Sequence, residues 1–393
     1  MTRKRRGRDE GSIFRRRDGL WAASVSLGYD ASGKRRRRVV YGKTKQEVRE
    51  KLRKLQDHAD EGSLAEKERL KLSEFLSRWL EQVVQPGRRP NTYRSYEGVV
   101  RNHICRQLAG VRLSNLTAMQ VQTLYRTMTA NGASARTCQL AHAVLHAALK
   151  RALKWGLVSR NVCDAVDPPR VPKKKMKVYN LGQVEALFAA VREHRLHALF
   201  VLAVATGLRQ GELFGLHWSD IDLQGDTLFV QQQLEEINGK FRLTEPKSAA
   251  GKRRIELPKF VVHILHEHRK RMLAEGRDVK TGPVFCDRRG GWLRKSNFIR
   301  QVFRPAIKRA NEAVIAKAKE KHVEHDLLPE IRFHDLRHTA ATLRLLQGDH
   351  PKVVQEMLGH AQISLTLGTY SHVTPSMQKD SADKLDRQFR RQA

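Results

Sequence analysis

The sequence predicts a multi-domain, mainly α-helical protein with a small β-sheet near its N-terminal end. Its 393 residues suffice for two or three domains with buried cores. Residues 11–58 alternate in polarity as strands do, whereas residues 70–167 repeat apolar side chains at helical spacing. A basic, proline-containing segment, Pro168–Lys175, cannot continue a helix and separates this region from a longer C-terminal part.

The net charge of the chain indicates which kind of partner it binds. Lys and Arg number 75 against 41 Asp and Glu, a formal net charge of +34. Such an excess indicates a polyanionic partner, either nucleic acid or an anionic membrane. The longest apolar run, Ala198–Ala205, is far shorter than the ~20 residues of a spanning helix, and residues 1–8 lack the apolar core of a signal peptide. We therefore expect a cytoplasmic, nucleic-acid-binding protein with no membrane contact.

The four cysteines are far apart, and no C-x-x-C pair occurs among them. They are Cys105, Cys138, Cys163 and Cys286. This spacing favours neither a disulfide framework nor a cysteine-based zinc site. We expect free thiols in a reducing compartment.

The N-terminal segment is basic and strand-like. Residues 1–45 contain fifteen Lys or Arg and four Asp or Glu. Three stretches alternate like strands, with turns at Asp18-Gly19 and Ser32-Gly33: Gly11–Phe14, Trp21–Leu27 and Arg35–Tyr41. Thr44 is placed to cap a helix that passes through Val48, Leu52 and Leu55. We expect a three-stranded sheet with one helix over residues 1–62, with residues 1–10 disordered.

Residues 70–167 have the pattern of an all-α bundle. The first helix has an apolar stripe made of Leu72, Phe75, Leu76, Trp79 and Leu80. Asn91 or Thr92 is expected to cap a second helix, Thr117 to start a third, and Ala133–Trp155 to form a fourth. Short connections favour a compact bundle. A linker is predicted over residues 168–178 and a mixed, mainly α domain with a small antiparallel sheet over residues 179–393.

The C-terminal domain opens with the motif Ala205–Leu213. An apolar helix, Leu199–Val204, is expected to end near Gly207, and the next helix to run through Leu213, Leu216 and Trp218. This arrangement places Arg209 at a helix junction, where its guanidinium can reach a cleft, and Glu212 three residues later can orient it. Alone the pair is a weak signal, because exposed ion pairs at this spacing are common.

Three strand-like stretches follow and are expected to form one antiparallel sheet. They are Thr227–Gln233, Lys240–Thr244 and Arg253–Leu257. Lys247 lies in the turn between the last two. A lysine in a turn is usually a solvated surface charge.

The last motifs gather histidines, an arginine and a tyrosine. In Arg332–Thr339, Asp335 can cap a helix, with His334 and Arg337 near its start. A second helix begins at Pro351 and ends at a left-handed Gly359, directly before His360. Tyr370 follows ten residues later.

Taken in order, these motifs resemble the active-site signature of the tyrosine recombinases. The match consists of T-G-L-R-x-G-E, a turn lysine, H-D-L-R-H-T, L-G-H and a closing T-Y. The resemblance covers residues 176–380, and it likens residues 70–167 to a core-site-binding domain and residues 11–58 to the arm-site-binding module of integrases. It implies a phage or mobile-element integrase with six catalytic residues: Arg209, Lys247, His334, Arg337, His360 and Tyr370.

These residue types suit phosphodiester cleavage without a metal or any other cofactor. Two arginines can clamp phosphate oxygens, and His360 can donate a further hydrogen bond to them. Tyrosine, with a free pKa near ~10, needs a cationic pocket and a base, for which His334 is the candidate. The resemblance assigns Lys247 as the acid for the 5′-oxygen and implies a 3′-phosphotyrosine intermediate, a homotetramer on double-stranded DNA with core and arm attachment sites, and excisionase and DNA-bending accessory proteins.

The sequence leaves alternatives open. His334, His338 and His360 could be zinc ligands, although two nearby arginines would repel a dication. Three other histidines, His263, His266 and His268, lie on a polar helix and are expected at the surface. The chain could be a DNA-binding regulator without strand transfer, or a chromosome-dimer-resolving recombinase. The tail Thr374–Ala393 is amphipathic and either folds back or packs on a neighbouring subunit.

Overall fold

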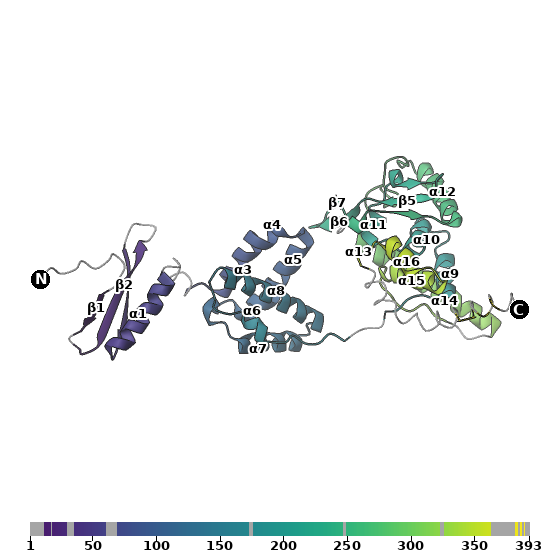
Figure 1. The fold of residues 1–393 in the computed structure, drawn as a ribbon. Helices are drawn as coiled ribbons and strands as arrows, with labels where there is room; N and C mark the ends of the chain where they lie inside the picture. Colours follow the sequence, from purple (N-terminus) through teal and green to yellow (C-terminus); the bar gives the residue numbers. More distant parts are fainter. Residues whose placement is uncertain are drawn as a thin grey trace. The chain divides into compact units, whose positions relative to one another are not determined.

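The computed structural model describes residues 12–16, 18–29, 35–59, 69–172, 176–246, 249–322 and 326–362, with four positions in the C-terminal tail. The chain divides into two compact units, Met1–Lys173 and Lys174–Ala393. Figure 1 shows helices in both units, with a small sheet at the N-terminal end of the first and short strands in the second, as the sequence predicted. The mainly α, multi-part fold class is confirmed.

The N-terminal part is a three-stranded antiparallel sheet with one helix against it. The strands β1 (Ser12–Arg15), β2 (Trp21–Tyr29) and β3 (Arg35–Gly42) pair in sequence order, and α1 (Lys45–Ala59) follows. Ala23, Val48 and Leu52 are buried between sheet and helix. As predicted, Thr44 caps α1, because its Oγ1 accepts a hydrogen bond from the backbone N–H of Glu47. The turn predicted at Ser32-Gly33 lies outside the described residues.

Residues 69–167 form an all-α bundle. Its elements are α3 (Leu72–Trp79), the π-helical turn Leu80–Val84, α4 (Gln85–Gly87), α5 (Pro90–Val99), the π-helical turn Val100–Ile104, α6 (Cys105–Leu108), α7 (Ala118–Ala130) and α8 (Ala135–Lys154), with short 3-10 turns at Leu113–Asn115 and Val162–Ala165. The predicted stripe of the first helix is buried. Thr117 caps α7 through a capping box with Gln120, and Ser134 caps α8.

The predicted cap of the second helix is wrong. Helix α5 begins at Pro90, with Arg89 in the extended cap position, so Asn91 and Thr92 lie inside the first turn. The reason is that proline lacks an N–H and has its φ preset, which suits the first helical position.

The second unit packs helices around the buried α10. Its helices are α9 (Leu181–Ala190), α10 (His197–Thr206), α11 (Gln210–Phe214), α12 (Lys259–Ala274), α13 (Lys295–Phe298), α14 (Arg304–Lys321), α15 (Asp335–Leu346) and α16 (Pro351–Leu358), with shorter turns at Trp218–Asp220, Ala249–Gly251 and Ile299–Phe303. Eight of the ten residues of α10 are buried, and this helix contacts α9, α11, α12 and α15. Such all-round burial explains the apolar run Ala198–Ala205, which is a core helix.

The strands of this unit do not form the single sheet that was predicted. Strand β5 (Thr227–Val230) pairs with β4 (Ile221–Asp222) and β8 (Arg253–Glu256). Strands β6 (Gln233–Ile237) and β7 (Lys240–Thr244) form a separate hairpin. The chain leaves the ladder after Val230, and the tight turn at Asn238-Gly239, with both residues at positive φ, pairs β6 with β7 alone.

Two further expectations are corrected. Helix α11 ends at Phe214 and does not reach Leu216 or Trp218. The next residue, Gly215, packs so closely on the β6 backbone that an added Cβ would lie 2.6 Å from the N of Leu234. His268, predicted to be a surface residue like His263 and His266, is buried and bonds through Nε2 to the carbonyl oxygen of Val284 at 2.8 Å.

Candidate active site

Arg209 occupies the junction between α10 and α11, as predicted. Gly207 ends α10 with φ +61°, and there an added Cβ would lie 2.6 Å from Leu358. Glu212 accepts hydrogen bonds from the backbone N–H of Arg209 at 2.9 Å and from its Nη1 at 2.7 Å. The Nη2 of Arg209 donates to the carbonyl oxygen of Gly359 at 3.2 Å. The side chain remains 35% exposed, so this guanidinium is both oriented and accessible.

A second arginine that the motifs did not single out shares the same carboxylate. Arg253 on β8 donates from Nη2 to Glu212 Oε2 at 2.9 Å and from Nε to the carbonyl oxygen of Met357 at 2.6 Å. A signal for its burial exists in the sequence, because alternation along the strand puts Arg253 on the same face as the apolar Ile255. Burial alone would raise the pKa of Glu212, but the Arg253 hydrogen bond and the charges of Arg253 and Arg209 outweigh it and hold that pKa below its ordinary value.

Arg337 connects three segments from inside the protein. It lies on the first turn of α15 and is 3% exposed. Its Nη1 donates to the carbonyl oxygen of Gly207 at 2.7 Å and its Nη2 to that of Leu358 at 2.6 Å. The ends of α10 and α16 are therefore held by one side chain.

The residues around Arg337 depart in one respect from the prediction. His334, not Asp335, precedes the first residue of α15. The Asp335 carboxylate accepts from the backbone N–H of Arg332 at 2.8 Å and from its guanidinium at 2.7 Å. Arg332 forms an ion pair with the Asp335 carboxylate, which holds that carboxylate toward the loop before α15. The His334 and His338 rings lie 5.7 Å apart in an edge-to-face arrangement.

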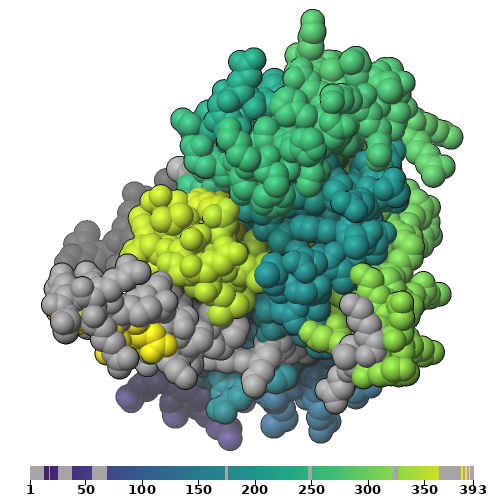
Figure 2. Space-filling model, turned by 90° about the vertical axis from the view of Figure 1, so that its right-hand side faces the viewer, coloured from purple at the N-terminus to yellow at the C-terminus, as the bar shows by residue number. Residues whose placement is uncertain are grey.

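His360 follows the left-handed Gly359 that ends α16, as predicted. A Cβ at Gly359 would lie 2.7 Å from the carbonyl oxygen of Ala250, so only glycine fits where this loop meets the segment before β8. The Gln355 side chain donates to the carbonyl oxygen of His360 at 3.0 Å and fixes the loop. Figure 2 shows this yellow-green segment beside the teal residues around α10 and below the green residues around α12.

Partial burial and the nearby arginines keep the three histidines unprotonated. Partial burial of the ring, with the charges of Arg337 and Arg209, lowers the pKa of His360 to about 4. Partial burial and the charge of Arg337 also lower the pKa of His334 and of His338. His334 keeps an exposed edge, where water lessens the effect of burial. All three imidazoles are therefore neutral at pH 7 and can each both accept and donate a hydrogen bond.

The structure brings together five of the seven predicted site residues: Arg209, Glu212, His334, Arg337 and His360. Lys247 and Tyr370 lie outside the described residues, as do Thr374–Ser381 and most of the remaining tail. Within the described ranges, no three His, Cys, Asp or Glu side chains are grouped as metal ligands. Nor does any described helix combine the length and apolarity needed to cross a membrane. All four cysteines carry free thiols.

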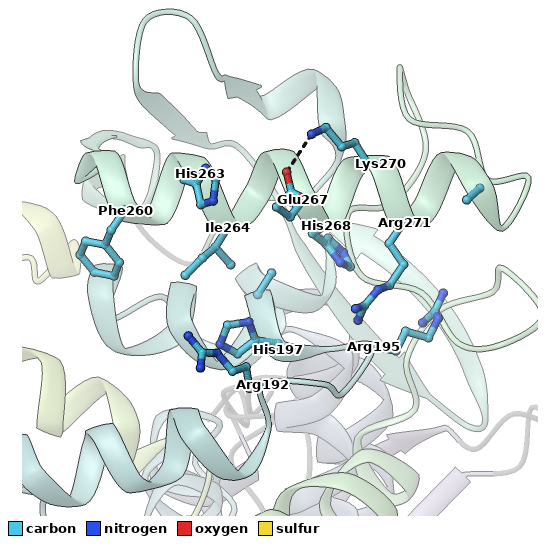
Figure 3. A pocket seen from close by; sticks show the side chains of 12 residues that line it. Arg192, Arg195, His197, Phe260, His263, Ile264, Glu267, His268, Lys270 and Arg271 are labelled. Atoms are coloured by element: carbon cyan, nitrogen blue, oxygen red, sulfur yellow. Dashed lines mark hydrogen bonds and ion pairs between the residues drawn. The ribbon is translucent and has the colours of Figure 1, made fainter.

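A groove of about 870 Å³ between α12 and the segment 192–198 is separate from these residues (Figure 3). His197, one of its lining residues, begins α10, whereas Arg209 follows the other end of that helix. Ten helical residues span about 15 Å. The groove is therefore not the site assembled around Arg209.

Comparison with known proteins agrees with the arrangement of these residues. The family described as the phage integrase family matches residues 178–377, and the N-terminal SAM-like domain of phage integrases matches residues 71–128. The chain belongs to the phage integrase family. A tyrosine recombinase XerC-like protein of Caldanaerobacter subterraneus is 30% identical over 94% of this chain and 96% of its own length. The ICEBs1 integrase of Bacillus subtilis is 25% identical over 95% and 99%.

Solved structures of two integrases share the fold. The Tn1549 transposon integrase, in complex with transposon right end DNA, matches with a TM-score of 0.65 at 20% identity, over 81% of this chain and 100% of that one. A lambda integrase dimer bound to a core site matches with a TM-score of 0.55 at 18% identity, over 93% and 96%. This phage integrase family member is a tyrosine site-specific recombinase of the mobile-element branch.

Proposed function

We propose that this recombinase integrates and excises a phage or mobile element by cleaving DNA at attachment sites, with Tyr370 as nucleophile. The observation that carries the proposal is the convergence of Arg209, Arg337 and His360 where α10, α15 and α16 meet. Arg209 and Arg337 donate to the carbonyl oxygens of the adjacent residues Gly359 and Leu358, directly before His360. Fixed cations of this kind stabilise the negative charge that develops on a phosphate in the transition state.

The arginines take the part that metal ions play in many nucleases. A guanidinium stays charged at every relevant pH and can hold two phosphate oxygens at once. Arg209 is the accessible member of the pair, with its orientation set by Glu212. Arg337, which is buried, adds its charge at short range and holds the two helix ends in place. No metal or other cofactor is part of this proposal.

The neutral histidines suit proton transfer and hydrogen bonding. With its pKa lowered, His334 is unprotonated at pH 7 and can accept the phenolic proton of Tyr370. His360, also neutral, can donate one N–H to a phosphate oxygen. Neither His334 nor His360 has to gain or lose a proton before the substrate binds.

The proposed step exchanges one phosphodiester bond for another. The Tyr370 oxygen attacks phosphorus as its proton passes to His334, the bond from phosphorus to the 5′-oxygen breaks, and Lys247 protonates that oxygen. A 3′-phosphotyrosine and a free 5′-hydroxyl remain. Because the bond energy is retained, the reverse attack by another 5′-hydroxyl rejoins the strand without ATP.

We further propose that different parts of the chain have different functions. Residues 1–62 would bind arm sites, residues 70–167 core sites, and residues 179–393 would carry catalysis beyond a linker at 168–178. The Tn1549 and lambda integrases are seen with DNA, and a lambda integrase tetramer is seen on a Holliday junction. These neighbours support DNA as partner and a homotetramer as active form. We propose that the DNA is double-stranded and that excisionase and DNA-bending proteins act as accessories.

One alternative function has an observation in its favour. The XerC-like relative matches over nearly its whole length, which is compatible with chromosome-dimer resolution. The basic sheet-and-helix module of residues 12–59 favours the integrase, because it offers a second DNA-binding surface. A regulator that binds DNA without cleaving it is the remaining alternative.

Trapping the covalent intermediate tests the proposal. The wild-type protein is incubated with a nicked duplex from the junction flanking its gene, from which the cleaved strand end diffuses away. We expect a protein–DNA adduct that survives denaturation, mapping to a peptide with Tyr370. Tyr370→Phe should bind this duplex normally and give no adduct, since only the hydroxyl is lost. Adduct formation by Tyr370→Phe at the wild-type level would rule out Tyr370, and absence of adduct with the wild type would favour the regulator.

A further inference from the structure

Arg209, Glu212, Arg253 and the end of α16 form a closed ring of hydrogen bonds. Arg209 Nη1 donates to Glu212 Oε1 at 2.7 Å, and Arg253 Nη2 donates to Glu212 Oε2 at 2.9 Å. Arg253 Nε reaches the carbonyl oxygen of Met357 at 2.6 Å, and Arg209 Nη2 that of Gly359 at 3.2 Å. The same two carboxylate oxygens and one helix end therefore fix both guanidinium groups.

The two arginines of the ring differ in what they can reach. The Arg209 side chain is 35% exposed, whereas that of Arg253 is 6% exposed and that of Glu212 1%. Arg253 also donates from Nη1 to the carbonyl oxygen of Gly251 at 2.9 Å. Its donors thus point at protein acceptors, and a phosphate on the surface would meet Arg209 instead.

Arg253 also provides a cationic partner for the buried carboxylate of Glu212. A carboxylate as buried as that of Glu212 needs cationic partners, because an unpaired charge there is costly. If Arg209 were its only partner, a bound phosphate would compete with Glu212 for that guanidinium. With Arg253 as a second, permanently buried cation, Glu212 stays paired while Arg209 engages the substrate.

We propose that Arg253 is a positioning residue for strand cleavage, which holds Glu212 and the end of α16 so that Arg209 and His360 face the same phosphate. This inference rests on the proposed function, in which Arg209 and His360 contact that phosphate. Arg253 itself touches no reacting atom.

The neighbouring residue provides a matched control. Arg254 lies on the same strand with its side chain 58% exposed, pairs with Glu256 at 3.0 Å and lies over the Phe229 ring. Arg253→Lys and Arg254→Lys each replace a planar guanidinium with an ammonium group and keep the positive charge. Only the first should affect cleavage.

The first measurement separates binding from chemistry on the nicked duplex. At saturating DNA, Arg253→Lys should cleave on the order of 10- to 100-fold more slowly, because a displacement of ~1 Å in a catalytic group can have that effect. Its Kd for the duplex should stay within about threefold, which is a change of less than 1 kcal/mol. A cleavage rate within threefold of the wild type would overturn the proposal.

A second variant separates positioning from mere stability. In Arg253→Met/Glu212→Gln both buried charges are removed, so the melting temperature should recover relative to Arg253→Met alone. Cleavage should not recover, because Arg209 has lost its fixed partner. Recovery of cleavage together with melting temperature would show that Arg253 serves stability alone.

Hydrogen exchange gives a readout that does not depend on activity. In Arg253→Lys, backbone amides of residues 209–214 and 355–360 should exchange about tenfold faster or more, as the loss of a charge-assisted hydrogen bond implies. Amides of the helical bundle should be unchanged, as should all amides in Arg254→Lys. If the wild type formed no adduct, the proposed function would fail while this measurement still decided the role of Arg253, and unchanged exchange would refute it.

Discussion

The guanidinium of Arg337 donates through Nη2 to the carbonyl oxygen of Leu358 at 2.6 Å, and through Nη1 to that of Gly207 at 2.7 Å. One buried cation thereby links the end of α10, which precedes Arg209, to the end of α16, which precedes His360. This planar group therefore helps to set the separation of the two catalytic segments, together with the bond from Arg209 to the carbonyl oxygen of Gly359. A change in that group should therefore affect both segments at once.

Arg337→Lys should impair both stability and cleavage. A lysine cannot donate to both carbonyl oxygens in the fixed fork geometry of arginine, and an unsatisfied buried carbonyl costs about 1–3 kcal/mol of unfolding free energy. Because the charge is kept but its fixed position and the two helix ends it holds are disturbed, cleavage should slow on the order of 10²-fold. Arg344→Lys is the matched control, since Arg344 also lies on α15 and bonds the carbonyl oxygen of Ala205. Equal cleavage defects in the two variants, measured in single turnovers, would contradict the role of Arg337.

Lys247→Ala should slow cleavage because the leaving 5′-oxygen loses its acid. A substrate with sulfur at that bridging position has a leaving group that needs no proton, so it should restore the rate of the variant toward that of the wild type. Comparing single-turnover rates on the two substrates checks this. Equal slowing on both would demote Lys247 to a phosphate contact.

Cleavage should continue in excess EDTA, because Arg209 and Arg337 supply the positive charge that a metal would supply. The measurement is the yield of covalent adduct with and without chelator, with a metal-dependent nuclease as control. Loss of adduct in EDTA and its return with zinc or magnesium would instead support His334, His338 and His360 as metal ligands.

Deleting residues 1–60 should leave cleavage of a short core-site duplex intact. Binding to a full attachment site should weaken, because two linked sites lose their joint affinity when one is removed. The salt dependence of binding should fall by about 0.9 log units per log salt for each phosphate that the shortened protein no longer neutralises.

The fragment 1–60 provides the decisive control for that deletion. A sequence-specific footprint outside the crossover region would support an arm-binding module. Absence of any footprint at low salt, with affinity lost equally for every duplex, would identify the segment as a non-specific basic tail.

His268 should make stability depend on pH. Burial lowers its pKa to about 4 in the folded protein, whereas an unfolded histidine titrates near ~6.5. Between these values the unfolded chain binds the extra proton, so the stability is present above pH ~6.5 and is lost as the pH falls toward 4. At about 1.4 kcal/mol per pKa unit, the full loss is on the order of 3–4 kcal/mol.

Urea unfolding at pH 7 and pH 4.5 measures this contribution. In His268→Gln the decrease in unfolding free energy between the two pH values should be smaller than in the wild type, because the titrating group is gone. His266→Gln, an exposed position on the same helix, should behave as the wild type. An identical pH dependence in all three proteins would show that His268 is not the source.

The sequence alone determined the features that depend on neighbouring residues. Thr44 and Thr117 cap their helices through side-chain bonds three residues ahead, and Gly207 and Gly359 end theirs in the left-handed conformation, since these signals are local. Pro90 shows the limit: either Asn91 or Thr92 was predicted as the cap, but proline takes the first helical position and places the cap at Arg89. The order and spacing of the catalytic motifs also identify the family without reference to the fold.

Only the tertiary structure decided which distant groups meet. Strand β5 pairs with β8, not with the nearer β7, because the Asn238-Gly239 turn closes the hairpin β6–β7 on itself. His268 lies on a helix of polar appearance, yet it is buried because its partner, Val284, comes from a separate segment. Arg253 became part of the site through contacts with Glu212, 41 residues before it, and Met357, 104 residues after it. Such pairings depend on the packing of the whole unit, and no local pattern of residues encodes them.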